Sequence, residues 1–499
     1  MKFLTRLEKT KLFWSVLALV LIFFLLRLPS IIEPYWYGDE GIYHVIGQAM
    51  HNGQLLYRDI WDNKPPLLYS IYAYANGDQM LVRFISLIVG FFSVVTFYLL
   101  SIKLFSSERI SFVTTLIYVL LFATPILEGN IANAENFILL PILFSAWFVV
   151  RFAFDPHRSK ENKKSGALPL LAAGFLIGTA FLFKIVAIFD LAAFALFLLL
   201  HELNNFSYST LKKTLIPIFS LVFGFLIPFS AAAIYFAMQG ILIDYLQGAF
   251  AGNVDYVGFE NSLFGIPQGL LLIKILSLVI ALLLIVVKRK SFSKVSLFIT
   301  LWTIFALFNA NFSGRPYTHY LLVMLPSFCL LIGLALSKKS LLHAKAEWIT
   351  IAVITLVTLF TFPTYGIGKT FAYYQTTIQF LNGNTDVRSY YSFFDSKTPR
   401  DYAIASFLSQ NTDSPDKVFI WGDSAQIYTL SDKLPPYKYT VSYHVKTSEA
   451  LIKETQEAIN EAKPKYIVVL PESQPLPFSV PLYIIRFNVD GAIIYERSI

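Results

Sequence analysis

A stretch of closely spaced charges follows the first apolar segment of the chain, in the sequence YGDEGIYHVIGQAMHNGQLLYRDIWDNKPPLLYSIYA from residue 37 to residue 73. Its acidic and basic side chains are Asp39, Glu40, Arg58, Asp59, Asp62 and Lys64. A carboxylate can take a proton from a hydroxyl, and a lysine or arginine can hold a phosphate. The alternative interpretation is structural: the acidic pair caps a helix, and Lys64 extends its ammonium group to the edge of a membrane.

Other charged residues stand at the ends of later apolar segments. Lys184 interrupts a long apolar run, NFSGRPYTHY contains Arg315, Tyr317 and His319, and EGNIANAENF contains Glu135. A lysine at a membrane boundary indicates a partner or an anion. Simple anchoring at the membrane surface, lipid-headgroup binding and helix capping are the structural alternatives for these residues.

One more acid, Asp190, lies inside an apolar run. A hydrogen bond between helices is the preferred interpretation of such a residue, and a proton relay is the alternative.

The composition shows what kind of protein must position these residues. Of the 499 residues, 56% are hydrophobic and only 14% are charged, which is typical of a protein that crosses a membrane many times. The net charge of +8 comes mostly from short basic clusters between apolar runs, where it orients helices, so nucleic acid is excluded as a partner. With one cysteine, the chain can form neither an intramolecular disulfide nor a cysteine-based metal cluster.

The hydrophobic pattern predicts about eleven transmembrane helices. They lie near residues 12–32, 81–102, 110–127, 135–152, 167–183, 185–201, 214–238, 268–287, 295–311, 320–337 and 347–363. The apolar run from 167 to 200 is counted as two spans, because one helix of that length would measure about 50 Å against a hydrocarbon core of about 30 Å. We expect the turn between them at Lys184.

The basic clusters predict the orientation of these spans. With the N-terminus in the cytoplasm and the first span retained as a signal anchor, every dense lysine and arginine cluster falls on the cytoplasmic side. The first loop, 33–80, and the tail from 364 to 499 then face outward. The tail contains DKVFIWG and PKYIVVL with a helical pattern between them, which predicts a small α/β domain. The expected domains are therefore a membrane module over 1–363 and an extracytoplasmic domain over 364–499.

This topology places the candidate residues at the outer membrane boundary. A phosphate attached to a lipid fits that depth, because its charge would lie among Lys64, Lys184 and Arg315 while its chain stays in the bilayer. A carboxylate could then deprotonate a hydroxyl that arrives from the aqueous side. This layout suits group transfer from a lipid-phosphate donor.

The segment from 37 to 73 resembles the first outer loop of the dolichyl-phosphate-mannose protein mannosyltransferase superfamily and its bacterial relatives, which include the aminoarabinose transferases. The acidic pair, the GQLLYRD step and the KPP turn carry this resemblance. The segments NAENFILLP, FKIVAIFDLAA, GRPYTHYLLVMLP and DKVFIWGDSAQIYTLSDKLPPYKY resemble later parts of the same superfamily in the same order. Unlike the aminoarabinose transferases, which have an arginine shortly after the acidic pair, this chain continues with Gly41 and Ile42.

The resemblance implies a GT-C membrane glycosyltransferase that uses a polyprenyl-phosphate sugar in the cytoplasmic membrane. It implies that Asp39 is the catalytic base and that Glu40 positions the acceptor or the base. The donor phosphate would be held by Lys64, Lys184 and Arg315. The substrate cavity would be lined by Arg58, Asp62, Glu135, Tyr317 and His319. The reaction would be a single displacement that inverts the anomeric carbon.

The sequence leaves several alternatives open. A transporter or flippase for lipid-linked sugars is the main one, although such proteins place ionisable residues near the bilayer midplane and often contain repeated halves. A scaffold with a working tail, a polymer ligase and an oligosaccharide transferase are others. Neither the sugar nor the kind of acceptor, whether glycan, lipid or protein, follows from the residues. No cofactor or metal ligand set is predicted, and dependence on a divalent cation remains an open alternative.

Overall fold

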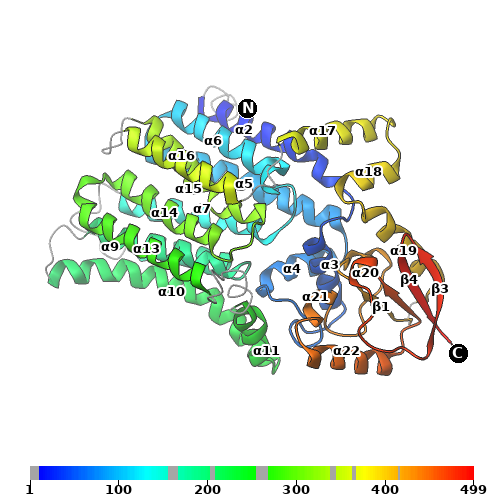
Figure 1. Cartoon of the computed structure of the whole chain (residues 1–499). Coiled ribbons are helices and arrows are strands. Elements are labelled where there is room, and N and C mark those ends of the chain that lie inside the picture. The colour runs from blue at the N-terminus through cyan, green and yellow to red at the C-terminus, as the bar shows by residue number, and fades with distance from the viewer. Residues whose placement is uncertain are drawn as a thin grey trace, which may run out of the picture. The chain divides into compact units, whose positions relative to one another are not determined.

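A computed structural model describes residues 11–154, 167–202, 208–253, 268–337, 344–361, 367–413 and 416–498 (Figure 1). The chain divides into two compact units. Unit 1 comprises Met1–Leu28, Ile85–Tyr235 and Ala251–Thr370, and unit 2 comprises Pro29–Phe84, Phe236–Phe250 and Phe371–Ile499. The two units are described in turn.

Unit 1 is built from long apolar helices. In chain order they are α2 (Lys11–Arg27), α5 (Gln79–Phe105), α6 (Glu108–Ala123), α7 (Ala134–Ala153), α8 (Ala167–Phe181), α9 (Ile188–Glu202), α10 (Tyr208–Met238), α13 (Gly269–Lys288), α14 (Lys294–Asn311), α15 (Leu325–Leu336) and α16 (Ala344–Thr361), and the first residues of α5 and the last of α10 belong to unit 2. Short 3-10 turns η2 (Pro125–Leu127), η4 (Ile185–Ala187) and η7 (Thr318–Val323) lie between them. A helix therefore occupies each of the predicted ranges.

The exposed surface of these helices requires a membrane. On α13, the side chains of Leu272, Leu283 and Leu284 are all more than half exposed. An exposed apolar surface of that extent is unfavourable in water. Six helices of the described part are long and apolar enough to cross a bilayer, and four further apolar helices are shorter. The chain is thus a membrane protein, and the count of eleven crossings stays a prediction.

The predicted division of the run from 167 to 200 is confirmed. Helix α8 ends at Phe181, Lys184 has an extended backbone, and α9 begins at Ile188. Small residues let α8 pack closely on α10. A Cβ on Gly174 would lie only 1.9 Å from the carbonyl oxygen of Leu221, so only glycine allows the backbones to approach this closely.

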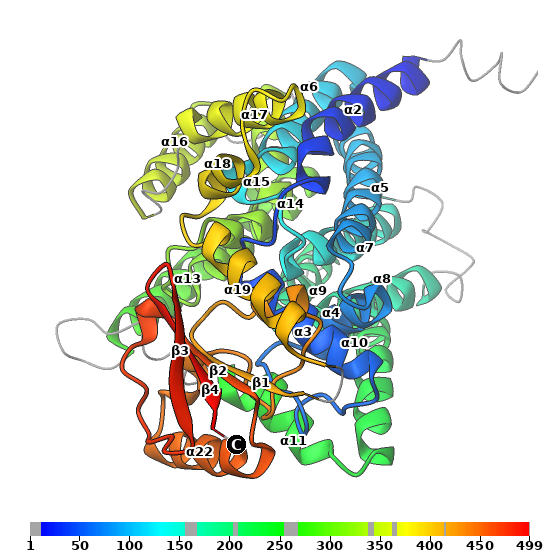
Figure 2. The ribbon, with the colours of Figure 1, turned by 90° about the vertical axis from the view of Figure 1, so that its right-hand side faces the viewer.

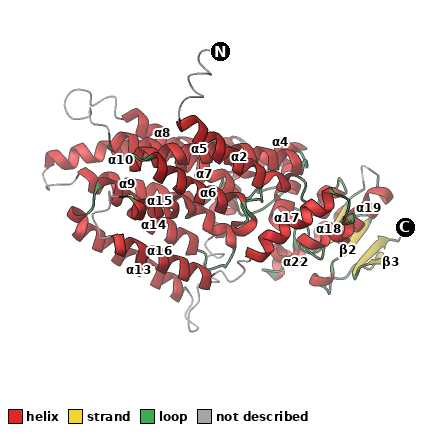
Figure 3. Cartoon of the chain, turned by 90° about the horizontal axis from the view of Figure 1, so that it is seen from above, coloured by secondary structure: helices red, strands yellow, loops and turns green. Residues whose placement is uncertain are grey.

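Unit 2 combines the first loop with the end of the chain. Its helices are α3 (Gly38–His51), α4 (Pro66–Ala75), α11 (Leu242–Leu246), α17 (Ile367–Leu381), α18 (Val387–Phe394), α19 (Thr398–Asn411), α20 (Gln426–Leu430), α21 (Ser442–Val445) and α22 (Glu449–Ala462), and the first residues of α17 belong to unit 1. Its strands are β1 (Val418–Trp421), β2 (Tyr466–Val469), β3 (Tyr483–Val489) and β4 (Ala492–Arg497). Among the described residues, strands occur only in this last part of the chain (Figure 3).

The four strands form one mixed sheet in the order β1-β2-β4-β3. Strands β1 and β2 are parallel and are connected through α22, whereas β4 pairs antiparallel with both β2 and β3. The predicted strand, helix and strand of the tail are confirmed, and the hairpin of β3 and β4 was not predicted. Its strand β3 is mostly exposed, so it has less of the buried apolar pattern that marks β1 and β2.

Helices cover both faces of this sheet (Figure 2). Alternate side chains of a strand point to opposite faces, so Phe419, Trp421 and Ile467 form one core, against which α22 packs. On the other face, the ring of Phe407 in α19 packs against the ring of Tyr466, with the ring centroids 5.3 Å apart. The first loop and the tail thus belong to one compact unit, while the division of the chain into a membrane module and an outer domain at residue 363 stays a prediction.

Candidate active site

Asp39 lies in the first turn of α3, and its carboxylate is held from two sides. The hydroxyl of Tyr43, one turn later, donates a hydrogen bond to Oδ2 at 3.0 Å. The same oxygen lies 3.6 Å from Nζ of Lys64, which itself sits 4.8 Å above the ring of Tyr43. The Asp39 side chain remains 34% exposed. The residue at the N-cap of α3 is Tyr37, whose side chain makes no capping bond, so Asp39 does not serve as the cap residue of this helix.

Asp62 is the second carboxylate near Lys64, and it is almost fully buried. Its Oδ2 accepts a hydrogen bond of 2.6 Å from the hydroxyl of Tyr69 and lies 3.8 Å from Nζ of Lys64. Its Oδ1 accepts a bond of 2.8 Å from the backbone N–H of Asn63. Burial raises the pKa of Tyr69 well above its usual value, so this hydroxyl stays protonated and remains a donor to Asp62.

The packing of α3 against α4 brings these residues together. The turn at Pro65 and Pro66 begins α4, because proline suits the first turn of a helix. Gly47 of α3 meets the backbone of α4, where an added Cβ would lie 2.4 Å from the carbonyl carbon of Tyr72. This close approach places Tyr69 on α4 beside Tyr43 on α3, with ring centroids 5.9 Å apart.

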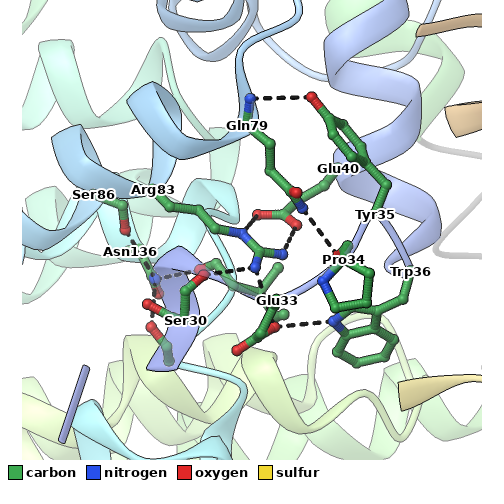
Figure 4. Close-up of polar contacts among 12 residues, drawn as sticks. Ser30, Glu33, Pro34, Tyr35, Trp36, Glu40, Gln79, Arg83, Ser86 and Asn136 are labelled. Carbon is green, nitrogen blue, oxygen red and sulfur yellow. Dashed lines mark hydrogen bonds and ion pairs between the residues drawn. The ribbon is translucent and has the colours of Figure 1, made fainter. Parts of the chain in front are cut away.

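Glu40 takes part in a different interaction from its neighbour Asp39. Its carboxylate pairs with Arg83 through contacts of 2.5 and 3.3 Å (Figure 4). Arg83 also donates to the carbonyl oxygen of Ser30 at 2.7 Å and lies 3.3 Å from Glu33. The side chains of Arg83, Glu33 and Glu40 are all fully or almost fully buried. Tyr373 of α17 donates a bond of 2.5 Å to Glu33, so this network ties the start of α3 to α17.

The C-terminal part of the chain contributes a residue that sequence reasoning missed. Nε2 of His444, on α21, lies 3.7 Å from Oδ1 of Asp62. Asp423 orients α21 by accepting bonds from the hydroxyl of Ser442 at 2.7 Å and from the N–H of Tyr443 at 3.2 Å. Burial lowers the pKa of His444, so its imidazole is neutral at neutral pH. The segment WGDS, residues 421–424, which begins with the last residue of strand β1, therefore positions a residue beside Asp62.

Arg58 is a predicted site residue that pairs with its neighbour in the chain. Its guanidinium forms a bidentate pair with the adjacent Asp59, at 2.7 and 2.9 Å, and its side chain is about half exposed. The hydrogen bond to Asp59 raises the pKa of Arg58 further above its already high value.

Unit 1 contains a second cluster of predicted residues. Lys184 forms an ion pair with Glu135, in the first turn of α7, and lies 4.2 Å above the ring of Tyr320. His319 stands between two carboxylates, with Nδ1 2.8 Å from Glu128 and Nε2 3.7 Å from Glu135. Glu128 and Glu135 lie seven residues apart in EGNIANAENF, whereas Lys184 and His319 come from two further segments, and the fold brings the three segments together.

The remaining predicted residues of unit 1 lie on the loop before η7. The ring of Tyr317 stacks on that of His319 at 5.6 Å and is partly exposed. The backbone N–H of Arg315 donates a hydrogen bond to the hydroxyl of Ser313 at 3.3 Å. Asp190 accepts a bond of 2.7 Å from the indole of Trp302, which links α9 to α14 as the interhelical interpretation expects.

Two of the residues that sequence reasoning missed could have been recognised from the sequence. Arg83 is a charge inside an otherwise apolar helix, and Glu33 ends the first apolar segment. A charge in or next to an apolar segment needs a partner of opposite charge, so an ion pair between Arg83 and Glu33 could have been predicted. In the part of the chain that the structure describes, no group of three or more His, Cys, Asp or Glu side chains could hold a metal ion, and the independence from metals stays a prediction.

A sequence profile places the chain in a family. The profile described as the competence-induced protein Ccs4 N-terminal domain matches residues 7–347, about two thirds of the chain. The chain belongs to the Ccs4 family. No curated protein matches this Ccs4 family member in sequence.

Solved structures show the fold that this Ccs4 family member shares. ArnT from Cupriavidus metallidurans bound to undecaprenyl phosphate is similar with a TM-score of 0.59 and 12% identity, over 97% of each chain. Its apo form is similar with a TM-score of 0.56 and 14% identity, over 96% of this chain and 97% of ArnT. The apo oligosaccharyltransferase of Archaeoglobus fulgidus aligns over 92% of this chain and 70% of its own, with 13% identity and a TM-score of 0.47. The predicted GT-C fold with a small C-terminal α/β part is confirmed by the likeness to ArnT.

Proposed function

We propose that the chain is an integral-membrane glycosyltransferase that moves a sugar from a polyprenyl-phosphate donor to an acceptor hydroxyl outside the cytoplasmic membrane. The likeness in fold to ArnT, whose structure contains undecaprenyl phosphate, supports a lipid-linked donor. In this proposal the N-terminus lies in the cytoplasm and the C-terminal domain faces outward. The glycan, lipid or protein that accepts the sugar binds on that outer side.

The arrangement around Asp39 is the observation that carries the proposal. Glu40 and Asp62 are almost fully buried and are held by Arg83 and Tyr69. Asp39 alone among these three carboxylates is substantially exposed, while Tyr43 and Lys64 fix its orientation. A base must reach the proton that it removes, so Asp39 is the member of this set suited to that role.

The proposed reaction is a single displacement at the anomeric carbon. Asp39 accepts the proton of the acceptor hydroxyl as the oxygen forms a bond with the anomeric carbon of the donor sugar. The bond between that carbon and the phosphate oxygen breaks on the opposite side, so the configuration inverts. The lipid phosphate leaves as an anion, and cations that hold it lower the barrier by several kcal/mol in a site from which water is excluded.

The cations assigned to the departing phosphate are Lys64, Lys184 and Arg315. Carboxylates lie beside the first two: Asp39 and Asp62 lie near Lys64, and Glu135 pairs with Lys184. A bound phosphate would replace these carboxylates as the partner of each lysine.

The other predicted residues have supporting roles. Glu40 positions the first turn of α3 through Arg83. The substrate cavity is assigned to Arg58, Asp62, Glu135, Tyr317 and His319. Because His444 lies beside Asp62, the C-terminal domain would contribute to the acceptor side of the same site.

The test is transfer from a panel of radiolabelled polyprenyl-phosphate sugars to acceptors in native membranes. Purified wild type is compared with Asp39→Asn, whose amide cannot take the proton, and we expect the variant to lose about 100-fold or more of the activity. Asp490→Asn is the matched control, because Asp490 is an exposed aspartate in a left-handed turn that asparagine tolerates. Equal transfer by wild type and Asp39→Asn would remove Asp39 from the mechanism. Failure of wild type to transfer any sugar of the panel would favour a transporter of lipid-linked sugars.

A further inference from the structure

Helix α17 has one face buried in unit 2 and an opposite face that is apolar and exposed. Tyr373 and Thr377, four residues apart, are almost fully buried. Phe371, Ile378 and Leu381 occupy the other side, where 72%, 58% and 66% of these side chains are exposed. Their spacing of seven and three residues places them along one stripe of the helix.

This exposure matches that of side chains facing lipid in the membrane helices. On α16, Ile349 and Leu356 are 63% and 66% exposed. A stripe of three large apolar side chains on one short helix is costly in water and is normal at a membrane surface. Lys369, near the start of α17, and the half-buried aromatic Tyr374 add the cationic and aromatic groups that favour the headgroup region.

The chain itself keeps α17 near the bilayer. Helix α16 ends at Thr361 and α17 begins at Ile367. Six backbone steps separate these residues, so even a fully extended chain would place them within about 20 Å of each other. The start of α17 therefore lies within about 20 Å of the end of α16, and hence close to one of the two membrane surfaces.

We propose that α17 lies in the headgroup region of the lipid bilayer, with Phe371, Ile378 and Leu381 inserted at the edge of the acyl chains. The occupant of this face is the bilayer that the apolar helices of unit 1 already require. Interfacial helices of this kind bind through their buried apolar area and through attraction of their basic residues to anionic lipids.

The position of α17 has a consequence for the candidate active site. Its buried Tyr373 donates to Glu33, which contacts Arg83, and Arg83 holds Glu40 beside Asp39. An interfacial α17 would thus hold the first turn of α3 at a set depth relative to the membrane surface. This consequence, which rests on the proposed function, would keep the base at the level of a lipid-borne phosphate.

The test measures the depth of a spin label at position 378. Cys329 is the one cysteine of the chain and is fully buried, so wild type treated with the label gives the background. The labelled variants are Ile378→Cys and Lys453→Cys, the latter on the exposed side of α22. Each full-length protein is placed in nanodiscs of phosphatidylcholine and phosphatidylglycerol, and its collision rates with oxygen and with a water-soluble nickel complex are compared.

We expect the label at 378 to collide more with oxygen than with the nickel complex, and the label at 453 to show the reverse. Equal access of nickel to both labels would overturn the proposal. Dipolar broadening between labels at 378 of two molecules would also overturn it, because a second copy of the chain would then cover this face. The triple variant Phe371→Ser, Ile378→Ser and Leu381→Ser should reduce the preference for oxygen that a label at Tyr374→Cys shows. None of these readings requires sugar transfer, so they stand even where the proposed enzymatic function fails.

Discussion

Removal of Arg83 should destabilise the protein more than removal of any exposed arginine. In Arg83→Met, the buried carboxylates of Glu33 and Glu40 lose the cation that contacts both. Breaking a buried ion pair from one side costs about 3–5 kcal/mol, because the charge left behind is desolvated and uncompensated. Two stranded carboxylates place Arg83→Met at the upper end of this range. At about 2–4 °C per kcal/mol for a unit of this size, the Tm should fall by on the order of 10 °C.

The assay is thermal unfolding of purified variants in one detergent, followed by intrinsic fluorescence. Arg388→Met is the matched control, since Arg388 is about three quarters exposed and pairs only loosely with Asp490 at 3.3 Å. Such a surface pair contributes less than about 1 kcal/mol. Replacing Glu33 and Glu40 by glutamine in the Arg83→Met background should recover at least half of the lost Tm, because neutral amides remove the uncompensated charges. A Tm for Arg83→Met within about 2 °C of the control would refute the reasoning.

Two further predictions concern packing and pH. Gly47→Ala should destabilise the protein by about 1–3 kcal/mol and lower any transfer activity, because its Cβ would overlap the backbone at Tyr72 and push α4 away from α3. Gly368→Ala, on α17 with open space around it, should leave the Tm unchanged, and equal Tm values for both alanine variants would contradict this account. Burial raises the pKa of Asp401 from 3.8 to about 6, so the folded state keeps a proton that the unfolded chain has already released. Stability should therefore fall by about 3 kcal/mol in total as the pH rises from well below 4 to well above 6, with about 2 kcal/mol of this loss between pH 4 and pH 6. When Tm is measured from pH 4.5 to pH 7.5, wild type should lose stability and Asp401→Asn should not. A difference in Tm between the two proteins that stays the same at every pH would contradict this prediction.

Much of the membrane architecture could be predicted because hydrophobicity acts locally along the chain. A run of about twenty apolar residues must form a helix in lipid, since its backbone polar groups have no other partners there. The apolar run around Lys184 had to break into two helices, because one helix of its length would exceed the thickness of the hydrocarbon core. The strand pattern of DKVFIWG and PKYIVVL could also be read directly, because both segments are buried on two faces. The exposed strand β3 gave no such pattern.

The candidate site was predictable as a set of residues and not as a set of contacts. Asp39 and Lys64 lie within one loop, so their proximity follows from short chain separation. The pairing of Lys184 with Glu135, across 49 residues, depends on how α7 and the segment before α9 pack. The different surroundings of Asp39 and Glu40 were also invisible in sequence, because adjacent helical residues point about 100° apart and only the packing decides which one is buried.

The amino-acid sequence by itself therefore determined that the protein crosses a membrane, roughly where its helices lie, and which charged residues could perform chemistry. Tertiary structure alone decided that the first loop folds with the C-terminal sheet into one unit, and that Arg83 holds Glu40 while Asp39 stays exposed. It also decided that His444 reaches Asp62. The physical reason is the distance along the chain over which each property acts. Hydrophobic periodicity is a property of neighbouring residues, whereas the partner of a buried charge depends on which helices pack together in the folded chain.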